Sequence, residues 1–363
     1  MSTGTSTPTF DETRAEAFVD RLLEIINSGG LALMVSVGHR TGLFDALASG
    51  DALTSVELAA RSGCNERYVR EWLGAMTVGR IVELDAAAGR YALPAEHAAF
   101  LTRAAAPDNV AVTAQYIAVL GGVEDDIVRC FTEGGGVPYE RFHRFHEVMA
   151  EESAQTTIGG LVDKILPLAP GLDERLRDGI RVADLGCGRG LAAAELAQRY
   201  PASTFVGLDL SPDAIAWARD NAASLGLSNV RYEERDLTTF DVDAEVGAFD
   251  LVTTFDAVHD QAAPLALLKG IHRSLAADGV YLMQDIDGHS HHHQNLDLPL
   301  APFMYAISCM HCMTVSLAQG GEGLGAMWGV EKAEELIREA GFATFEAKRL
   351  DHDPINVYVV ARP

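Results

Sequence analysis

The sequence predicts an α/β fold in which a doubly wound sheet follows an N-terminal helical domain. From residue 180 onward, short apolar strands alternate with helical segments, an order that is typical of such sheets. A glycine-rich turn at 186–190 joins the first strand to a helix, as in turns that hold nucleotides. The 363 residues, 48% hydrophobic and 22% charged, suffice for two domains with a sizeable core.

The strands expected in the sheet are short runs rich in apolar residues. They cover 180–185, 204–209, 230–233, 249–255, 280–286, 344–350 and 355–361. We therefore expect three parts: a disordered tail at 1–10, a helical domain at 11–170, and the sheet domain at 171–363. Residues 287–330 form an insertion in the sheet domain and are predicted to cover a bound substrate.

Within the helical domain, residues 54–93 predict two helices followed by a β-hairpin, the order of a winged helix. Thr54 and Glu57 form a capping box at the start of the first helix. The second helix is expected at 66–78, and the hairpin strands at 81–84 and 90–93. Upstream, apolar residues at helical spacing predict a helix over 16–27, which Gly29-Gly30 is expected to end.

Charge argues against nucleic acid as a partner. The chain carries a formal net charge of −24, which repels a phosphate backbone. Between Arg40 and Arg103 there are seven basic and eight acidic residues, whereas a winged helix that reads DNA is normally strongly basic. We therefore favour a structural or dimerisation role for the winged helix over DNA binding through its second helix.

Cysteine usage and the N-terminus predict a cytoplasmic location. The five cysteines are odd in number and irregularly spaced, and residues 1–9 lack the apolar core of a secretory leader. We expect no apolar run to approach the eighteen or so residues of a membrane span, and therefore no membrane partner.

Three alternating glycines follow an acidic residue at the end of the first strand: Asp184, Gly186, Gly188 and Gly190. The spacing matches neither the dinucleotide-binding G-x-G-x-x-G nor the P-loop. It resembles motif I of the class I S-adenosylmethionine (SAM) methyltransferases. The resemblance covers 180–363 by motifs and 15–105 by architecture. It implies a Rossmann-like, seven-stranded fold and SAM as cofactor, with the turn admitting its methionine portion and Asp184 near its amino group.

The other predicted cofactor contacts lie at the ends of the following strands. Asp209 comes nineteen positions after Gly190, where a carboxylate accepts ribose hydroxyls; its alternative role is a helix cap. Asp236 resembles the motif residue that accepts the adenine amino group, with Leu237 against the ring; its alternative is a turn residue. The predicted set is completed by Leu210 and Phe255.

His259 and Asp260 follow the fourth strand and are the predicted catalytic pair. They resemble the His-Asp pair of winged-helix O-methyltransferases, in which the histidine removes the substrate's hydroxyl proton. An unperturbed imidazole titrates near pH 6.5 and is available as a base at neutral pH. Gln261 stands where that family has tryptophan. Two alternatives stay open: Asp260 caps a helix beside a noncatalytic His259, or catalysis is by positioning alone.

The insertion contributes His311 as a further catalytic candidate. The segment from His311 to Gly325 resembles a stretch of bacterial winged-helix methyltransferases, which places His311, Tyr305 and Trp328 near the pocket. Cys309, Cys312 and the histidines at 289–293 are possible zinc ligands. No second matched pair accompanies them, and in a helix over 302–318 His311 would point away from the two cysteines. No metal is therefore predicted.

Together these features predict a SAM-dependent methyltransferase that acts on a small molecule, at oxygen. The resemblance also implies a homodimer formed through the N-terminal helices. Two alternatives remain: a SAM-responsive transcriptional regulator that uses the winged helix, and a SAM-binding protein without transferase activity.

Overall fold

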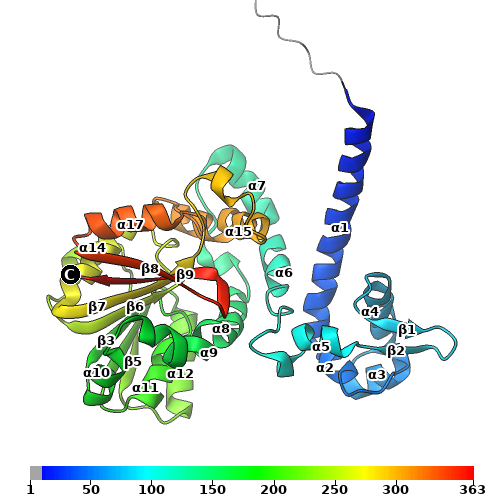
Figure 1. The fold of residues 1–363 in the computed structure, drawn as a ribbon, viewed down its shortest axis with the longest axis horizontal. Helices are drawn as coiled ribbons and strands as arrows, with labels where there is room; N and C mark the ends of the chain where they lie inside the picture. The colour runs from blue at the N-terminus through cyan, green and yellow to red at the C-terminus, as the bar shows by residue number, and fades with distance from the viewer. Residues whose placement is uncertain (1–9) are drawn as a thin grey trace, which may run out of the picture. The chain divides into compact units, whose positions relative to one another are not determined.

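The computed structural model describes residues 10–363, so most of the tail predicted at 1–10 lies outside the described residues. The chain divides into two compact units, one up to Ala118 and one from Val119 to Pro363 (Figure 1).

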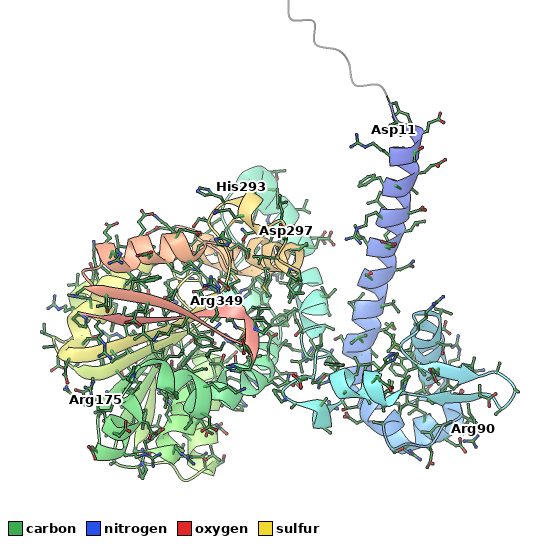
Figure 2. All side chains as sticks on the ribbon, in the orientation of Figure 1. Asp11, Arg90, Arg175, His293, Asp297 and Arg349 are labelled. Carbon is green, nitrogen blue, oxygen red and sulfur yellow. The ribbon has the colours of Figure 1, made fainter. Side chains whose placement is uncertain are left out.

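The first unit opens with a long helix, α1 (Glu12–Arg40), whose N-terminal cap is Asp11 (Figure 2). The Asp11 carboxylate accepts a hydrogen bond from the main-chain N–H of Arg14. The predicted break at Gly29-Gly30 is wrong. A glycine costs a helix only about 1 kcal/mol relative to alanine, and the helix continues through both.

Two described helices are long and apolar enough to match a membrane span, contrary to our expectation from the sequence. They are α1 and the stretch Ala301–Ala318, and the most apolar segment of each has a mean hydropathy of 1.3. In that segment, 17% of the residues are buried in α1 and 44% are buried in Ala301–Ala318. Core helices of soluble proteins also reach these values, so length and hydropathy do not by themselves identify a membrane helix.

A winged helix follows, as predicted. Thr54 and Glu57 exchange both hydrogen bonds of the capping box at the start of the first helix. Tyr91 of the hairpin also pairs with Leu53, so the wing is tied to the chain just before that helix. The elements are α2 (Leu43–Leu47), α3 (Ser55–Ser62), α4 (Glu66–Val78), β1 (Glu83–Asp85), β2 (Arg90–Ala92), α5 (Ala95–Leu101) and η1 (Arg103–Ala105).

Short helices lead to the sheet: α6 (Gln115–Gly121), α7 (Glu124–Glu133), η2 (Tyr139–Arg141), α8 (Phe145–Gln155), α9 (Thr157–Gly160), η3 (Leu161–Ile165), η4 (Leu166–Leu168) and α10 (Leu172–Asp178). Residues 142–168 are thus divided among several short helices. Leu161, Ile165 and Leu176 pack in one core with Val182 and Phe205 of the sheet. The second unit consequently begins at Val119, whereas the sequence placed the sheet domain from 171.

The sheet has seven strands, as predicted, in the order β5-β4-β3-β6-β7-β9-β8. The first five are parallel, and β9 runs antiparallel to both of its neighbours. The carboxyl ends of β3, β4 and β6 therefore meet at one edge. The strands are β3 (Arg181–Leu185), β4 (Thr204–Asp209), β5 (Val230–Glu234), β6 (Phe249–Phe255), β7 (Leu275–Ile286), β8 (Thr344–Leu350) and β9 (Asp353–Arg362).

Helices cover both faces of the sheet (Figure 1). The core on one face includes Leu268 of α14 and Ile337 of α17, and the core on the other includes Leu176 of α10 and Leu196 of α11. The covering helices are α11 (Leu191–Arg199), α12 (Pro212–Ser224), α13 (Phe240–Asp243), α14 (Pro264–Ser274) and α17 (Val330–Glu339). The insertion after β7 folds into η5 (His292–Asn295), α15 (Ala301–Ile307), the π-helical turn η6 (Ser308–Cys312) and α16 (Met313–Ala318).

Candidate active site

A pocket of about 510 Å³ lies at the edge of the sheet where β3, β4 and β6 end. All nine residues predicted to bind the cofactor line it except Gly190. The pocket is walled on its other side by residues of η2 and α8. This is the position at which open α/β sheets bind their ligands.

The three glycines of the turn have different surroundings, although all have positive φ. A Cβ on Gly186 would lie 2.5 Å from that of Ala257, and a Cβ on Gly190 would lie 2.2 Å from the ring of Tyr232. These two glycines allow the turn to pack. A Cβ on Gly188 would meet only His146, at 4.0 Å, so its main chain is open toward the pocket.

Asp209 joins the turn to the end of β4. Its carboxylate accepts hydrogen bonds from the main-chain N–H groups of Gly188, at 2.7 Å, and Ser211, at 2.8 Å. The side chain that caps α12 is Ser211, so Asp209 is not the N-cap. Leu210, next in the chain, is 45% exposed although it also lines the pocket, which leaves an apolar surface available to a ligand.

Asp236 and Leu237 follow β5 and line the same pocket. Asp236 closes a local turn, because its carboxylate accepts from the N–H of Thr238 at 2.9 Å and from its hydroxyl at 2.7 Å. Leu237 is buried, and Phe255 reaches the pocket from the end of β6. Asp236 therefore closes a turn and lines the pocket at the same time, so the two roles considered for it do not exclude each other.

Asp184 is buried at the bottom of the pocket. Its carboxylate accepts a hydrogen bond from the hydroxyl of Thr253 at 2.9 Å. Burial raises the pKa of Asp184 to about 7, although the bond from Thr253 opposes the shift. A cationic group in the pocket would favour the ionised form.

His259 lies behind the pocket. The ring is 1% exposed, and its Nδ1 lies 2.8 Å from Asp285 Oδ1. Its Nε2 faces Asp260 Oδ1 at 3.3 Å, and of this pair only Asp260 lines the pocket. Burial lowers the pKa of His259, but the carboxylates of Asp285 and Asp260 outweigh it and raise that pKa well above its ordinary value.

Asp256 is a pocket residue that sequence reasoning did not select. Its φ of +55° is a rare conformation for a residue with a side chain, and such positions cluster at functional sites. Burial raises the pKa of Asp256 to about 7, and it raises the pKa of Asp260 as well. The only signal in the sequence is the position of Asp256 directly after β6.

His311 is completely buried behind the aromatic wall of the pocket. Its ring stacks on Phe145 with centroids 3.4 Å apart and meets Tyr139 and Phe142 edge-on. Burial lowers the pKa of His311 well below its usual value, so the ring is neutral. Tyr305 and Trp328, which were predicted with His311 to lie near the pocket, are also absent from its lining. Trp328 donates a hydrogen bond to Asp285, and Tyr305 accepts one from Asn295.

The aromatic wall itself was missed from the sequence. Tyr139 of η2, Phe142 just after it, and Phe145 and His146 of α8 line the pocket. In the sequence, the stretch from Phe142 to His146 contains two phenylalanines, each followed by a histidine, and it was not predicted to be part of a site. The signal that could have identified the wall is this concentration of aromatic rings shortly after the three glycines at 134–136.

The expected geometry of the two insertion cysteines is corrected by the structure. The π-helical turn η6 buries both His311 and Cys312, whereas Cys309 remains half-buried. His311 and Cys312 both approach Asp260, so the expectation that His311 points away is wrong for Cys312. In the histidine run, His289 pairs with Glu331 at 2.7 Å, and His291 stacks on His293.

The strand order and the glycine turn beneath a polar pocket define the Rossmann-like fold of class I methyltransferases. Comparison with known families agrees: residues 176–341 match the methyltransferase domain family, and residues 29–103 match the family described as the Rv2258c-like winged HTH domain. The chain thus combines a methyltransferase domain with an N-terminal winged helix-turn-helix domain.

Several proteins that are similar to this chain are named as methyltransferases. A trans-aconitate 2-methyltransferase of Deinococcus radiodurans is 34% identical over 31% of this chain and 40% of its own length. A ubiquinone biosynthesis O-methyltransferase of Ruegeria pomeroyi is 27% identical over 50% of this chain and 68% of its own. Among solved structures, PigF with SAH has a TM-score of 0.67 and 19% identity, covering 98% of this chain and 100% of that one. At that identity the likeness concerns the fold.

Proposed function

We propose that the protein transfers a methyl group from SAM to an oxygen atom of a small organic molecule. The observation that carries the proposal is the pocket itself. It brings the glycine turn and Asp209 together with Asp256 and Asp260, beside an aromatic wall.

The residues present fit SAM. Gly188 offers an open main chain, and Asp209 and Asp236 follow adjacent strands, where they can accept from ribose and adenine. The pocket is lined by eight carboxylates and three guanidinium groups, an excess of negative charge that suits a cofactor bearing a sulfonium and an ammonium. Bound there, SAM would supply an electrophilic methyl group.

The residues of the chain would position the acceptor and receive its proton. Asp256 and Asp260 are the pocket carboxylates that lie close to His259, at 3.9 and 3.3 Å. Burial raises the pKa of Asp256 to about 7, which suits it to proton transfer near neutral pH, and burial raises the pKa of Asp260 as well. His259 contacts Asp260 from behind, so the two form one unit in which a proton is shared. His311 supports the aromatic wall through its stack on Phe145.

Cofactor binding is tested by calorimetry with SAM on the full chain. Asp209→Ala removes the predicted ribose acceptor and should abolish measurable binding. Gly188→Ala should weaken binding because its methyl group points into the pocket. Gly226→Ala is the matched control, since Gly226 has a similar positive φ but open surroundings. Unchanged affinity in Asp209→Ala would contradict the proposed cofactor site.

Chemistry is tested by methylation assays across hydroxyl, amine and thiol compounds. We expect transfer to hydroxyl compounds, and His259→Gln should lower kcat far more than it changes SAM affinity. Equal rates in the variant and the wild type would leave positioning as the mechanism. SAM binding without transfer to any acceptor would favour the alternative of a binding protein.

A further inference from the structure

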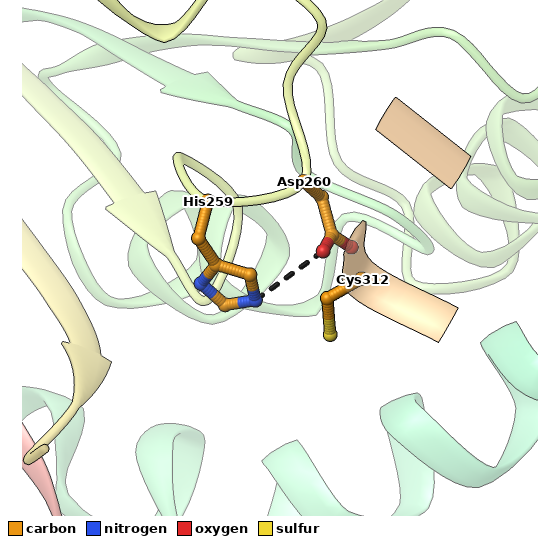
Figure 3. A group of neighbouring side chains, drawn as sticks. All are labelled: His259, Asp260 and Cys312. Atoms are coloured by element: carbon orange, nitrogen blue, oxygen red, sulfur yellow. Dashed lines mark ion pairs between the residues drawn. The ribbon is translucent and has the colours of Figure 1, made fainter. Parts of the chain in front are cut away.

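Three side chains capable of binding a metal ion converge at the wall of the pocket: His259, Asp260 and Cys312 (Figure 3). Each offers one ligand atom, and these atoms all lie within 4.8 Å of one another. The first two residues follow β6, and the third ends the π-helical turn η6. From this convergence we propose that the protein binds a zinc-class divalent metal ion through His259, Asp260 and Cys312.

The hydrogen bonds of His259 leave the correct nitrogen free for a metal. Nδ1 lies 2.8 Å from Asp285 Oδ1, which also accepts from Trp328 Nε1 at 3.1 Å. Because a carboxylate accepts, Nδ1 keeps its proton, and Nε2 is the nitrogen that can release a proton to bind a metal ion. Metal-binding histidines commonly have this carboxylate behind them, which fixes the ring and strengthens the ligand.

His259 Nε2 faces Asp260 Oδ1 across 3.3 Å, so either the proton that the two share or a metal ion in its place lies between them. Tetrahedral zinc with bonds of about 2.0–2.3 Å places its ligand atoms about 3.3–3.8 Å apart. The observed distance suits the ion without movement of this pair.

A second observation points to the same place. His311 is completely buried, and neither ring nitrogen has a hydrogen-bond partner among the described residues. Its Nδ1 lies 3.8 Å from the other carboxylate oxygen of Asp260. A neutral imidazole left unpaired beside the cluster could join the coordination sphere or bind a water that does.

The chemical types of the three ligand atoms indicate which metal ion the site would bind. A thiolate with imidazole and carboxylate is a set that zinc prefers, whereas magnesium and calcium prefer oxygen alone. Three protein ligands leave a fourth position for water or a substrate atom, as in catalytic zinc sites. Asp260 lines the pocket, so an atom bound in the pocket has a route to that position.

The group formed by Asp256, His259 and Asp285 is a less suitable site. Nδ1 of His259 is already in a direct hydrogen bond with Asp285, and Asp285 Oδ1 accepts from a main-chain N–H and from Trp328 as well. The metal proposal goes beyond the proposed methyl transfer and does not depend on SAM binding.

The test is metal content of the untagged full chain, stripped with a chelator and reloaded with Zn²⁺ or Co²⁺. We expect about one equivalent of tightly held metal per chain, and a cobalt spectrum with a thiolate charge-transfer band. Cys312→Ser should remove that band, and His259→Gln should reduce the bound metal at least tenfold. The matched control Cys309→Ser, on the same helical stretch but outside the cluster, should retain both.

A second control addresses the exposed histidines. A variant with His291, His292 and His293 changed to Ala should bind metal as the wild type does. The proposal is overturned if the wild type holds no metal, if the histidine variant loses it, or if Cys312→Ser retains the cobalt thiolate band. The wild-type cobalt spectrum reports a cysteine ligand even where a variant fails to fold.

Discussion

Gly190 and Gly226 have nearly the same main-chain conformation, with φ of +68° and +67°, but different surroundings. A Cβ on Gly190 would lie 2.2 Å from Tyr232, whereas one on Gly226 would meet nothing within 4 Å. We expect Gly226→Ala to cost about 1 kcal/mol from its dihedral angle, and Gly190→Ala to cost about 2–4 kcal/mol. Urea unfolding of both variants measures the difference, and equal losses would show that the Tyr232 ring moves aside freely.

Asp184 should make stability depend on pH. Its folded pKa of about 7 is above the ordinary aspartate value of 3.8, so the folded protein binds a proton more tightly than the unfolded chain. The resulting stabilisation is complete below the unfolded pKa and is lost as pH rises through about 7. Asp184→Asn keeps an acceptor for Thr253 but does not titrate.

Unfolding free energies of the wild type and Asp184→Asn at pH 5 and pH 8 test this expectation. The wild type should lose stability relative to the variant between these values, because it must then bury a charge. A pH profile that is parallel in the two proteins would show that Asp184 is ionised throughout in the folded state.

At the scale of elements, Thr54 offers a prediction for the winged helix. Its hydroxyl accepts from the N–H of Glu57 at 3.2 Å, and the Glu57 carboxylate accepts from the N–H of Thr54 at 2.8 Å. Thr54→Ala should therefore destabilise the first unit by about 1 kcal/mol, and Thr54→Ser should restore most of it. Thermal unfolding of the three proteins provides the measurement; a Ser variant no more stable than Ala would argue against the cap.

The strands were predictable because each is a short apolar run bounded by turn residues, and β4 and β6 have the expected bounds. The helices were less predictable, since packing decides where they end. Gly29-Gly30 did not interrupt α1, and a π-helical turn places His311 and Cys312 where regular helical spacing would not. The pocket wall was missed because Phe142 and Phe145 approach Asp184 and Asp209 only through tertiary folding.

At the scale of the whole molecule, the strongly negative charge bears on possible partners. The net charge of −24 and the balance of charges in the winged helix predict no salt-dependent binding to promoter DNA. On α4, Arg67 pairs with Glu71 and Arg70 pairs with Glu66, so the cations of the helix that would read DNA are partly neutralised. A gel shift at low ionic strength would contradict this expectation and favour the regulator alternative.

The exposed apolar face of α1 leads to a prediction about assembly. Phe18, Leu22 and Ile26 recur at helical spacing and are 61%, 41% and 69% exposed, a stripe that a helix normally buries. Because related winged-helix methyltransferases are expected to pair through N-terminal helices, we expect a second copy of the chain to cover it. Wild-type protein should then sediment as a dimer and the double variant Leu22→Glu, Ile26→Glu as a monomer.

Val242→Glu changes an equally exposed apolar side chain outside α1 and should leave the dimer intact. A wild-type monomer at micromolar concentration, or a double variant that still dimerises, would contradict the assignment of α1 to the interface. The hydropathy of α1 makes lipid the competing partner. Flotation with phospholipid vesicles separates the two, since a dimer that has buried the stripe leaves little apolar surface for the bilayer and should remain in the soluble fraction.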